Sequence, residues 1–205
     1  MATFEPEGSG TAGMALDAPY AVLDVETTGF KSYEDRVVEV AVVQITKHGE
    51  ISGEWSSIVH ADGADGASNI HHLPPSARAH APGFGDIADE LLSQLSGRVV
   101  VAHNASFDEG FLAAELKRAG KAVPTLPALC SLNLARRALP KLGRHKLPDC
   151  TAAHGIEVTD AHTALGDTRA LAQILIPMLA RVSAPRYPVA PVKFDAVAVS
   201  QAQSR

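Results

Sequence analysis

Short apolar runs separated by polar turns occur along the first part of the chain and have the length of β-strands. The runs occupy residues 20–26, 36–46, 51–59, 98–102 and 128–132. A His48-Gly49-Glu50 turn joins the second run to the third, which predicts a hairpin. The fourth run is continuous and β-branched, which is typical of a strand buried on both faces of a sheet.

Apolar residues at helical spacing predict helices between and after the later strands. The predicted helices occupy residues 74–81, 86–95, 105–119, 132–139, 147–155 and 163–180. Gly120 suits the end of the third helix, and Pro177 is expected to bend the last one. Three early strands followed by strands interleaved with helices predict an α/β domain with a mixed sheet flanked by helices.

The two ends of the chain differ in composition from the part between them. Residues 1–18 are rich in Gly, Ala, Glu and Pro and are expected to form a disordered tail. Residues 184–205 contain several prolines and are expected to form an extended tail. The length of 205 residues suits one folded domain between these tails, over residues 19–183.

Charge and cysteine usage narrow the class of protein. The net charge of −5 argues against a dedicated DNA coat, but a nuclease with an acidic metal site remains compatible with it. No apolar run is long enough to span a membrane, and the N-terminus lacks the pattern of a secretory signal. Cys130 and Cys150 lie in apolar surroundings and are expected to be buried thiols, which favours a reducing cytoplasm.

Two acids lie on the first predicted strand. Asp24 and Glu26 are two residues apart, so both side chains leave the same face of the strand. The alternative is a solvent-facing pair at a strand end. The Thr27-Thr28-Gly29 turn follows directly and is expected to expose backbone N–H groups that bind a phosphate or a hydroxyl.

A third acid opens a helix. Asp108 shares a helical stripe with Leu112 and Leu116, which places it on the buried face, whereas Glu109 is better placed to be solvated. A favourable contact with the helix dipole is the alternative explanation for Asp108. His103 and Asn104 lie between strand and helix and are expected to cap and orient this corner.

The last helix carries the fourth acid. Asp167 shares a face with apolar residues that are expected to be core: Ala164, Leu171, Ile174, Leu175 and Met178. His162 precedes it by five residues, about 140° around a helix, and therefore lies at the helix entrance. This position suits a proton acceptor better than a metal ligand, although a surface histidine is the simpler alternative.

Together these segments indicate a shared metal site. Buried carboxylates carry a desolvation penalty unless they are compensated, and a divalent cation is the usual partner of several converging acids. The predicted metal ligands are Asp24, Glu26, Asp108 and Asp167.

The same residues resemble the motifs of the DnaQ-like 3′→5′ exonucleases of the DEDDh group. The first motif reads LDVETTG at residues 23–29, the second VAHNASFD at 101–108, and the third HTALGD at 162–167. The resemblance extends from about residue 20 to 179, and Thr163 stands where the sister group has tyrosine. Ile70-His71-His72 departs from the Ile-His-Gly of the family, so contacts of that loop are not carried over.

The resemblance implies a ribonuclease-H-like fold with a five-stranded mixed sheet and two Mg²⁺ or Mn²⁺ ions. In the hypothesised mechanism, Asp24 bridges the two ions, Glu26 and Asp167 complete one site, and Asp108 holds the other. His162 takes the proton from the attacking water. The family supplies the 3′→5′ direction and suggests that the Thr27 backbone meets the terminal 3′-hydroxyl.

Other residues are candidates for holding the nucleic acid. A stretch without acids contains Arg136, Arg137, Lys141, Arg144, His145 and Lys146, and either follows a phosphate backbone or forms a solvated loop. Phe30 follows the Thr-Thr-Gly turn and either stacks on the terminal base or belongs to the core. Thr27, Thr28 and Asn104 complete the predicted substrate-binding residues, with Arg136 and Lys146 representing the basic stretch.

The function expected from these features is 3′→5′ removal of 5′-mononucleotides from single-stranded DNA in proofreading or repair. An exoribonuclease that trims RNA ends or short oligonucleotides uses the same chemistry. A non-catalytic nucleic-acid-binding module and a polymerase adaptor are further alternatives. In the adaptor, residues 192–199 would pair with a partner's sheet, although an unstructured end is the simpler expectation.

Overall fold

The computed structural model describes residues 18–61, 80–160, 162–182 and 191–193. Its centre is a mixed sheet with the strand order β3-β2-β1-β4-β5-β6. The strands are β1 (Tyr20–Thr27), β2 (Val37–Ile45), β3 (Ile51–Ile58), β4 (Val99–Ala102), β5 (Thr125–Cys130) and β6 (Pro191–Lys193). β1 is antiparallel to β2 and parallel to β4, so the sheet changes direction at its central strand.

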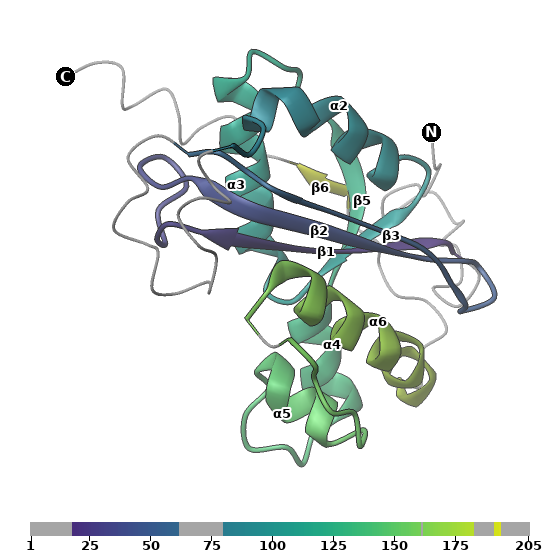
Figure 1. Ribbon diagram of the computed structural model, residues 1–205. Coiled ribbons are helices and arrows are strands. Elements are labelled where there is room, and N and C mark those ends of the chain that lie inside the picture. Colours follow the sequence, from purple (N-terminus) through teal and green to yellow (C-terminus); the bar gives the residue numbers. More distant parts are fainter. Residues whose placement is uncertain (1–17, 62–79, 161, 183–190, 194–205) are drawn as a thin grey trace.

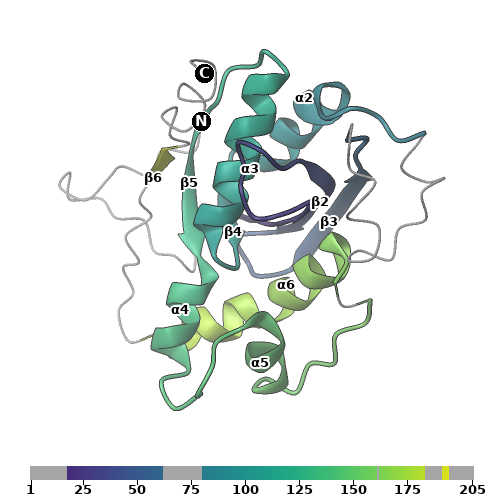
Figure 2. The same ribbon diagram turned by 90° about the vertical axis from the view of Figure 1, so that its left-hand side faces the viewer.

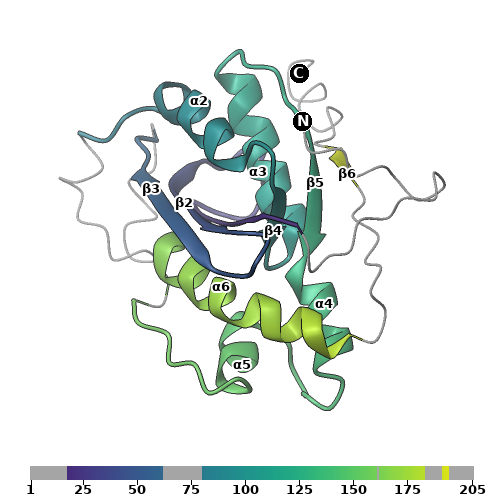
Figure 3. The same ribbon diagram turned by 90° about the vertical axis from the view of Figure 1, so that its right-hand side faces the viewer.

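Helices cover both faces of the sheet, as Figure 1 shows. They are α2 (Phe84–Leu95), α3 (Ala105–Arg118), α4 (Ser131–Ala138), α5 (Leu147–Ala152) and α6 (Ala164–Arg181). α2 and α3 lie on one face, and α4, α5 and α6 lie on the other, an arrangement that the two side views confirm (Figures 2 and 3).

The alternation of side chains along β1 divides the core into two clusters. Tyr20 and Val22 pack with residues of α4, α5 and α6, whereas Leu23 and Val25 pack with residues of α2 and α3. Because both faces of β1 are covered, its apolar residues are almost continuous. Even-numbered residues of β1 therefore face α6, and this direction decides where its acids point.

The five strands β1 to β5 confirm the predicted mixed sheet flanked by helices, with small shifts at element ends, and β6 adds a sixth strand at the edge. β5 lies at Thr125–Cys130 rather than at 128–132, because Ser131 already begins α4. Cys150 is buried as expected, but Cys130 is only half-buried because it lies at the end of β5. α6 continues through Pro177 to Arg181.

The chain ends modify the expected boundaries. Ala18, the last residue of the predicted N-terminal tail, is buried in the core. Residues 191–193 are not an unstructured end: they form β6, antiparallel to β5 of the same chain. The expected helix at 74–81 falls almost wholly outside the described residues, and so does the Ile70-His71-His72 loop. Among the described helices, none combines the length and the apolar character that crossing a membrane requires.

Candidate active site

Asp24 and Glu26 project from β1 toward the face that α6 covers. They have the same parity as Tyr20 and Val22, which pack on that side. Both acids are half-buried, while Val25 between them points into the other core cluster. The strand therefore places two carboxylates side by side at its C-terminal end, as the spacing predicted.

α6 adds the third acid. Asp167 lies in the first turn of this helix, whose N-cap residue Thr163 accepts a hydrogen bond from the Gly166 N–H. One carboxylate oxygen each of Asp24, Glu26 and Asp167 lies within 4.8 Å of the others. Acids that are 141 residues apart in sequence thus converge on one point (167 minus 26).

Asp108 lies next to this group but not within it. It is 3% exposed, as the stripe with Leu112 and Leu116 predicted. Its Oδ1 accepts a hydrogen bond from the Val25 N–H at 3.3 Å. The last register pair of β1 with β4 is Val22 with Val101, so Val25 lies beyond the neighbouring strand and Asp108 takes up its N–H. Asp108 therefore approaches the acids from the end of the sheet.

The charges of these acids oppose one another. Burial, and then the neighbouring carboxylates of Asp108, Glu26 and Asp167, hold the pKa of Asp24 well above its usual range. Burial raises the pKa of Glu26 to about 7 and that of Asp108 to about 8. Burial also raises the pKa of Asp167, although a hydrogen bond from the His162 backbone partly offsets it.

This electrostatic arrangement fits a divalent cation. Several carboxylates so close together are not all ionised at neutral pH without positive charge between them. The donor set is made of carboxylate oxygens, which are the ligands that Mg²⁺ and Mn²⁺ prefer. Asp24, Glu26 and Asp167 are therefore the residues suited to hold a cation, with Asp108 beside them.

A fifth acid, Glu39, was missed by the sequence reasoning. It stands opposite Glu26 in the β1–β2 register, is 8% exposed, and raises the pKa of both Asp24 and Glu26. The signal was present in the sequence, because Glu39 interrupts the apolar run of a central strand, where a charged residue is unusual.

Without cations, the protein should lose stability as the pH rises from 7 to 8.5. The folded state holds protons on Asp108 and Asp24 that the unfolded chain, with ordinary pKa values near 4, has released. The free energy of unfolding therefore decreases as the pH passes the raised values. The melting temperature in a chelator should fall over this window, and Mg²⁺ should raise it more at pH 8.5 than at pH 7.

His103 sets the lower limit, pH 7, of the pH range in which this loss of stability can be observed. Burial lowers the pKa of His103, so its own contribution changes below about pH 7 and in the opposite direction. A melting temperature that does not change with pH in chelator, or an equal effect of Mg²⁺ at both pH values, would contradict the repulsion described here.

His162 lies at the entrance of α6, as the sequence spacing predicted. Its side chain is exposed, and its backbone adopts a left-handed conformation with φ of 67°. The backbone donates a hydrogen bond to Asp167, and the imidazole is close enough to lower the pKa of that acid. The histidine is therefore adjacent to the acids but open to solvent.

The turn after Glu26 is held together by its own side chains. The Thr27 hydroxyl donates to the Gly29 carbonyl at 2.6 Å, and the Thr28 N–H donates to the Arg36 carbonyl at 2.9 Å. The Thr28 N–H is thus used within the protein and, contrary to expectation, is not directed at a ligand. Asp35 accepts hydrogen bonds from the Lys31 N–H and the Thr28 hydroxyl and closes the loop.

Phe30 lies on this loop and is 91% exposed. The core alternative for Phe30 is therefore wrong, because the loop closes on itself and leaves the ring outside. An aromatic ring so exposed can stack on a base.

Asn104 occupies the N-cap position of α3 with φ of 77°, but its exposed side chain makes no capping hydrogen bond. The expected position of Asn104 at the helix start is therefore confirmed, and its carbonyl accepts the Phe107 N–H at 2.8 Å, but its side chain does not cap the helix. His103 does organise this corner: its Nε2 donates to the His145 carbonyl at 2.8 Å, and its Nδ1 lies 3.0 Å from the Ser131 hydroxyl.

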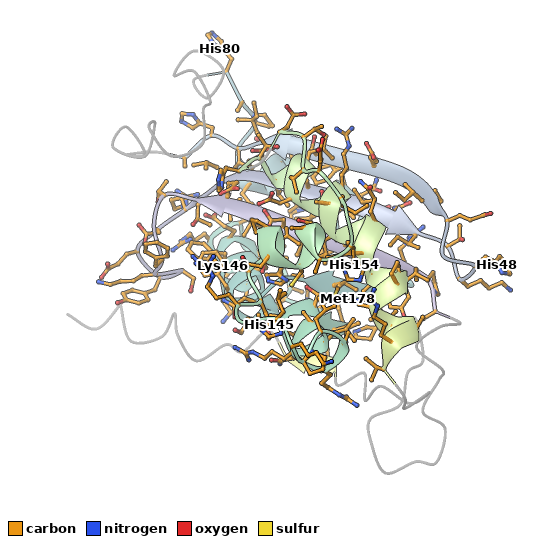
Figure 4. The ribbon with its side chains drawn as sticks, turned by 90° about the horizontal axis from the view of Figure 1, so that it is seen from below. His48, His80, His145, Lys146, His154 and Met178 are labelled. Atoms are coloured by element: carbon orange, nitrogen blue, oxygen red, sulfur yellow. The ribbon has the colours of Figure 1, made fainter. Side chains whose placement is uncertain are left out.

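The contact with His103 fixes the basic loop (residues 136–146) next to the end of β4. His145 in turn contacts the Leu139 carbonyl through Nε2 at 3.0 Å. Arg136 on α4 and Lys146 at the N-cap of α5 are both exposed and lie outside the acid cluster. Seen from below in Figure 4, Lys146 lies toward the side away from His48, which marks the tip of the β2–β3 hairpin.

The sequence is similar to those of known exonucleases and polymerases. The sequence model of the RNase T exonuclease family matches residues 21–175. DNA polymerase III of the PolC type from Staphylococcus saprophyticus is 33% identical over 169 residues, which cover 82% of this chain. The PolC-type polymerase of Staphylococcus aureus is 33% identical over 165 residues. The chain spans about 12% of the length of the first of these relatives and 11% of the second.

Solved structures share the architecture. The nuclease domain of 3′hExo, a DEDDh family member bound to rAMP, has a TM-score of 0.71 and 14% identity, covering 88% of this chain and all of that one. Escherichia coli exonuclease I in complex with a dT13 oligonucleotide has a TM-score of 0.69 and 20% identity, covering 80% of this chain and 41% of that one. At these identities the likeness concerns the fold, and it confirms the predicted ribonuclease-H-like architecture.

Proposed function

Because the chain belongs to the RNase T exonuclease family, we propose that it is a metal-dependent 3′→5′ exonuclease that releases 5′-mononucleotides from single-stranded DNA. One observation supports this proposal above all others. Carboxylates of Asp24, Glu26 and Asp167 converge within 4.8 Å, and His162 stands directly beside Asp167. Such a set of groups suits the hydrolysis of a phosphodiester.

Asp24, Glu26 and Asp167 would hold one divalent cation, Mg²⁺ or Mn²⁺, and Asp24 with Asp108 a second. Cations bound there supply positive charge where the phosphate develops negative charge. The carboxylates, held on β1, α3 and α6, keep this charge in one place without rearrangement during the reaction.

His162 serves as the general base. Its neutral imidazole accepts the proton of the attacking water, and its exposed position lets water reach it. The hydrogen bond from the His162 backbone to Asp167 keeps this base beside the acids. The leaving group is the 3′-oxygen of the penultimate nucleotide.

The 3′ end is held by the loop after β1. Thr27, at a bulge in the β1–β2 register, would meet the terminal 3′-hydroxyl through its backbone, and Thr28 shapes the turn. Phe30 would stack on the terminal base, because its ring is exposed on a loop that Asp35 braces. Asn104, exposed at the start of α3, would contact the strand from the other side of the acids.

The basic loop would guide the phosphate backbone. Its cations are exposed, and the contact between His103 and His145 keeps the loop at the active-site end of β4. Replacing both Arg136 and Lys146 by Gln should reduce the salt dependence of single-strand binding by about two counterions. A salt titration of affinity measures this slope, and an unchanged slope would show that neither residue contacts a phosphate.

Single-stranded DNA is the preferred substrate in this proposal because the PolC-type relatives are DNA polymerases and exonuclease I was solved with a dT13 oligonucleotide. An exoribonuclease is the second candidate, since 3′hExo was solved bound to rAMP. Proofreading or repair would follow from a DNA substrate, and a DNA polymerase subunit is then the proposed partner.

One experiment tests reaction, direction and substrate together. Matched 5′-labelled DNA and RNA strands are incubated with Mg²⁺, with Mn²⁺ or with chelator. A ladder that shortens from the unlabelled end, and that chelation abolishes, is the expected result. Internal cleavage, or activity that survives chelation, would reject the proposal, and the relative rates on the two strands decide the sugar preference.

A further inference from the structure

The turn that carries His162 is tied to the start of α6 by a short chain of hydrogen bonds. The Asp160 carbonyl accepts from the Thr163 N–H at 3.2 Å and from the Thr163 hydroxyl at 2.8 Å. The Thr163 oxygen in turn accepts from the Gly166 N–H at 3.0 Å. Thr163 therefore caps the helix and holds the preceding turn at the same time.

Gly166 allows the backbone of residues 159–160 to lie directly against the first turn of α6. A Cβ atom at Gly166 would overlap the Asp160 carbonyl oxygen and lie 2.8 Å from the carbon that bears it. The same atom would lie 2.9 Å from the Thr159 carbonyl oxygen. All of these are backbone atoms, and the Asp160 carbonyl also accepts two hydrogen bonds, so they cannot move away without moving the turn itself.

The turn adopts a conformation that needs such support. Asp160 and His162 both have left-handed backbones, with φ of 59° and 67°. Side-chain-bearing residues rarely adopt this region, because the Cβ atom crowds the carbonyl oxygen. The contacts with Thr163 and Gly166 therefore stabilise a conformation that the isolated turn would leave.

We propose that Gly166, together with Thr163, is a positioning residue that holds His162 in place to accept the proton of the attacking water. The absence of a side chain at Gly166 allows the 159–160 backbone to pack on α6, and Thr163 bonds it there. The proposal rests on the nuclease function proposed above, but its structural part can be tested separately.

The test is Gly166→Ala in a cycle with His162→Ala. Gly166→Ala should lower kcat about 10- to 100-fold, with KM and the Mg²⁺-induced rise in melting temperature unchanged, because the acids stay in place. In the His162→Ala background the same change should have little further effect. Thr163→Val, which keeps the shape but removes the hydroxyl, should lower kcat in the same way and carries the test if Gly166→Ala does not fold.

Gly85→Ala is the matched control. Gly85 also lies in the first turn of a helix, but a Cβ there meets only the Ala119 side chain at an ordinary 3.5 Å. This variant should retain full kcat. An unchanged kcat in Gly166→Ala, or an equal loss with and without His162, would overturn the positioning role.

A measurement without catalysis separates this inference from the proposed function. The imidazole resonance of His162, assigned by its absence in His162→Ala, should shift in Gly166→Ala while that of His154 stays in place. If the wild-type protein shows no nuclease activity and the His162 resonance still shifts in Gly166→Ala, the function is rejected and the positioning is supported. An unshifted His162 resonance would overturn the positioning whatever the activity.

Discussion

Asp24→Asn should reduce the rate of hydrolysis by about 10³-fold or more, equivalent to about 4 kcal/mol of transition-state stabilisation. Asp24 faces every other acid of the site, since Asp108, Glu26, Asp167 and Glu39 all raise its pKa. It is therefore the carboxylate best placed to contact two cations at once. An amide keeps the shape but removes the charge on which cation binding depends.

The same substitution should stabilise the cation-free protein. A half-buried carboxylate surrounded by acids is costly to ionise, and replacing it by a neutral amide removes most of the desolvation cost and the repulsion. The melting temperature in chelator at pH 8 should rise by several degrees, because about 1 kcal/mol corresponds to about 2–4 °C in a domain of this size. The Mg²⁺-induced rise seen in the wild-type protein should largely disappear.

Asp89→Asn provides the control for the Asp24 variant. Asp89 is 81% exposed and pairs with Lys121 on the opposite side of the sheet, so the same chemical change should leave activity and cation response intact. An Asp24→Asn protein with near wild-type turnover would show that the cations do not need this carboxylate. An unchanged or lower melting temperature in chelator would show that the buried charge is compensated in some other way.

His162→Ala should lower kcat about 10²–10⁴-fold while cation binding is retained. The group whose ligand atoms lie within 4.8 Å of one another consists of three acids and does not include the exposed imidazole of His162. Removing the imidazole should therefore not disturb the cation site. The kinetic and thermal measurements should therefore separate: turnover falls, whereas the Mg²⁺-induced rise in melting temperature keeps its wild-type size.

His48→Ala is the matched control for His162. His48, labelled in Figure 4, is exposed at the turn between β2 and β3. This turn lies at the end of the sheet where β1 begins, whereas Glu26 and Thr27 lie at the other end of β1. The His48→Ala variant should turn over substrate at the wild-type rate. Equal activity in His162→Ala and His48→Ala would remove His162 from the mechanism, and loss of the cation response would reclassify it as a ligand.

The opposite effects on the cation response expected for Asp24→Asn and His162→Ala follow from the different surroundings of the acids and the histidine. The acids repel one another in the folded protein, a repulsion that the proposed cations would relieve, whereas the histidine lies outside this cluster and is open to solvent. β1 is covered on both faces, and this rigid position keeps the repelling carboxylates from moving apart.

The directions of the acidic side chains could be predicted from the sequence because each segment encodes its own periodicity. Alternation along β1 places Asp24 and Glu26 on one face, and the stripe of Asp108 with Leu112 buries that acid. Periods of two and of 3.6 residues are local properties, so they are legible without any tertiary contact. The mixed sheet flanked by helices followed from the same periods, whereas the expectation of five strands came from the family resemblance.

Contacts between distant segments were decided only by the tertiary structure. Phe30 is exposed because Asp35 closes its loop, Glu39 joins the site because β2 pairs with β1 in one register, and β6 forms because its segment returns to β5. The close approach of Asp160 to Gly166 likewise depends on how a turn packs on a helix. Local periodicity determines which face a side chain takes, but only packing determines what that face meets.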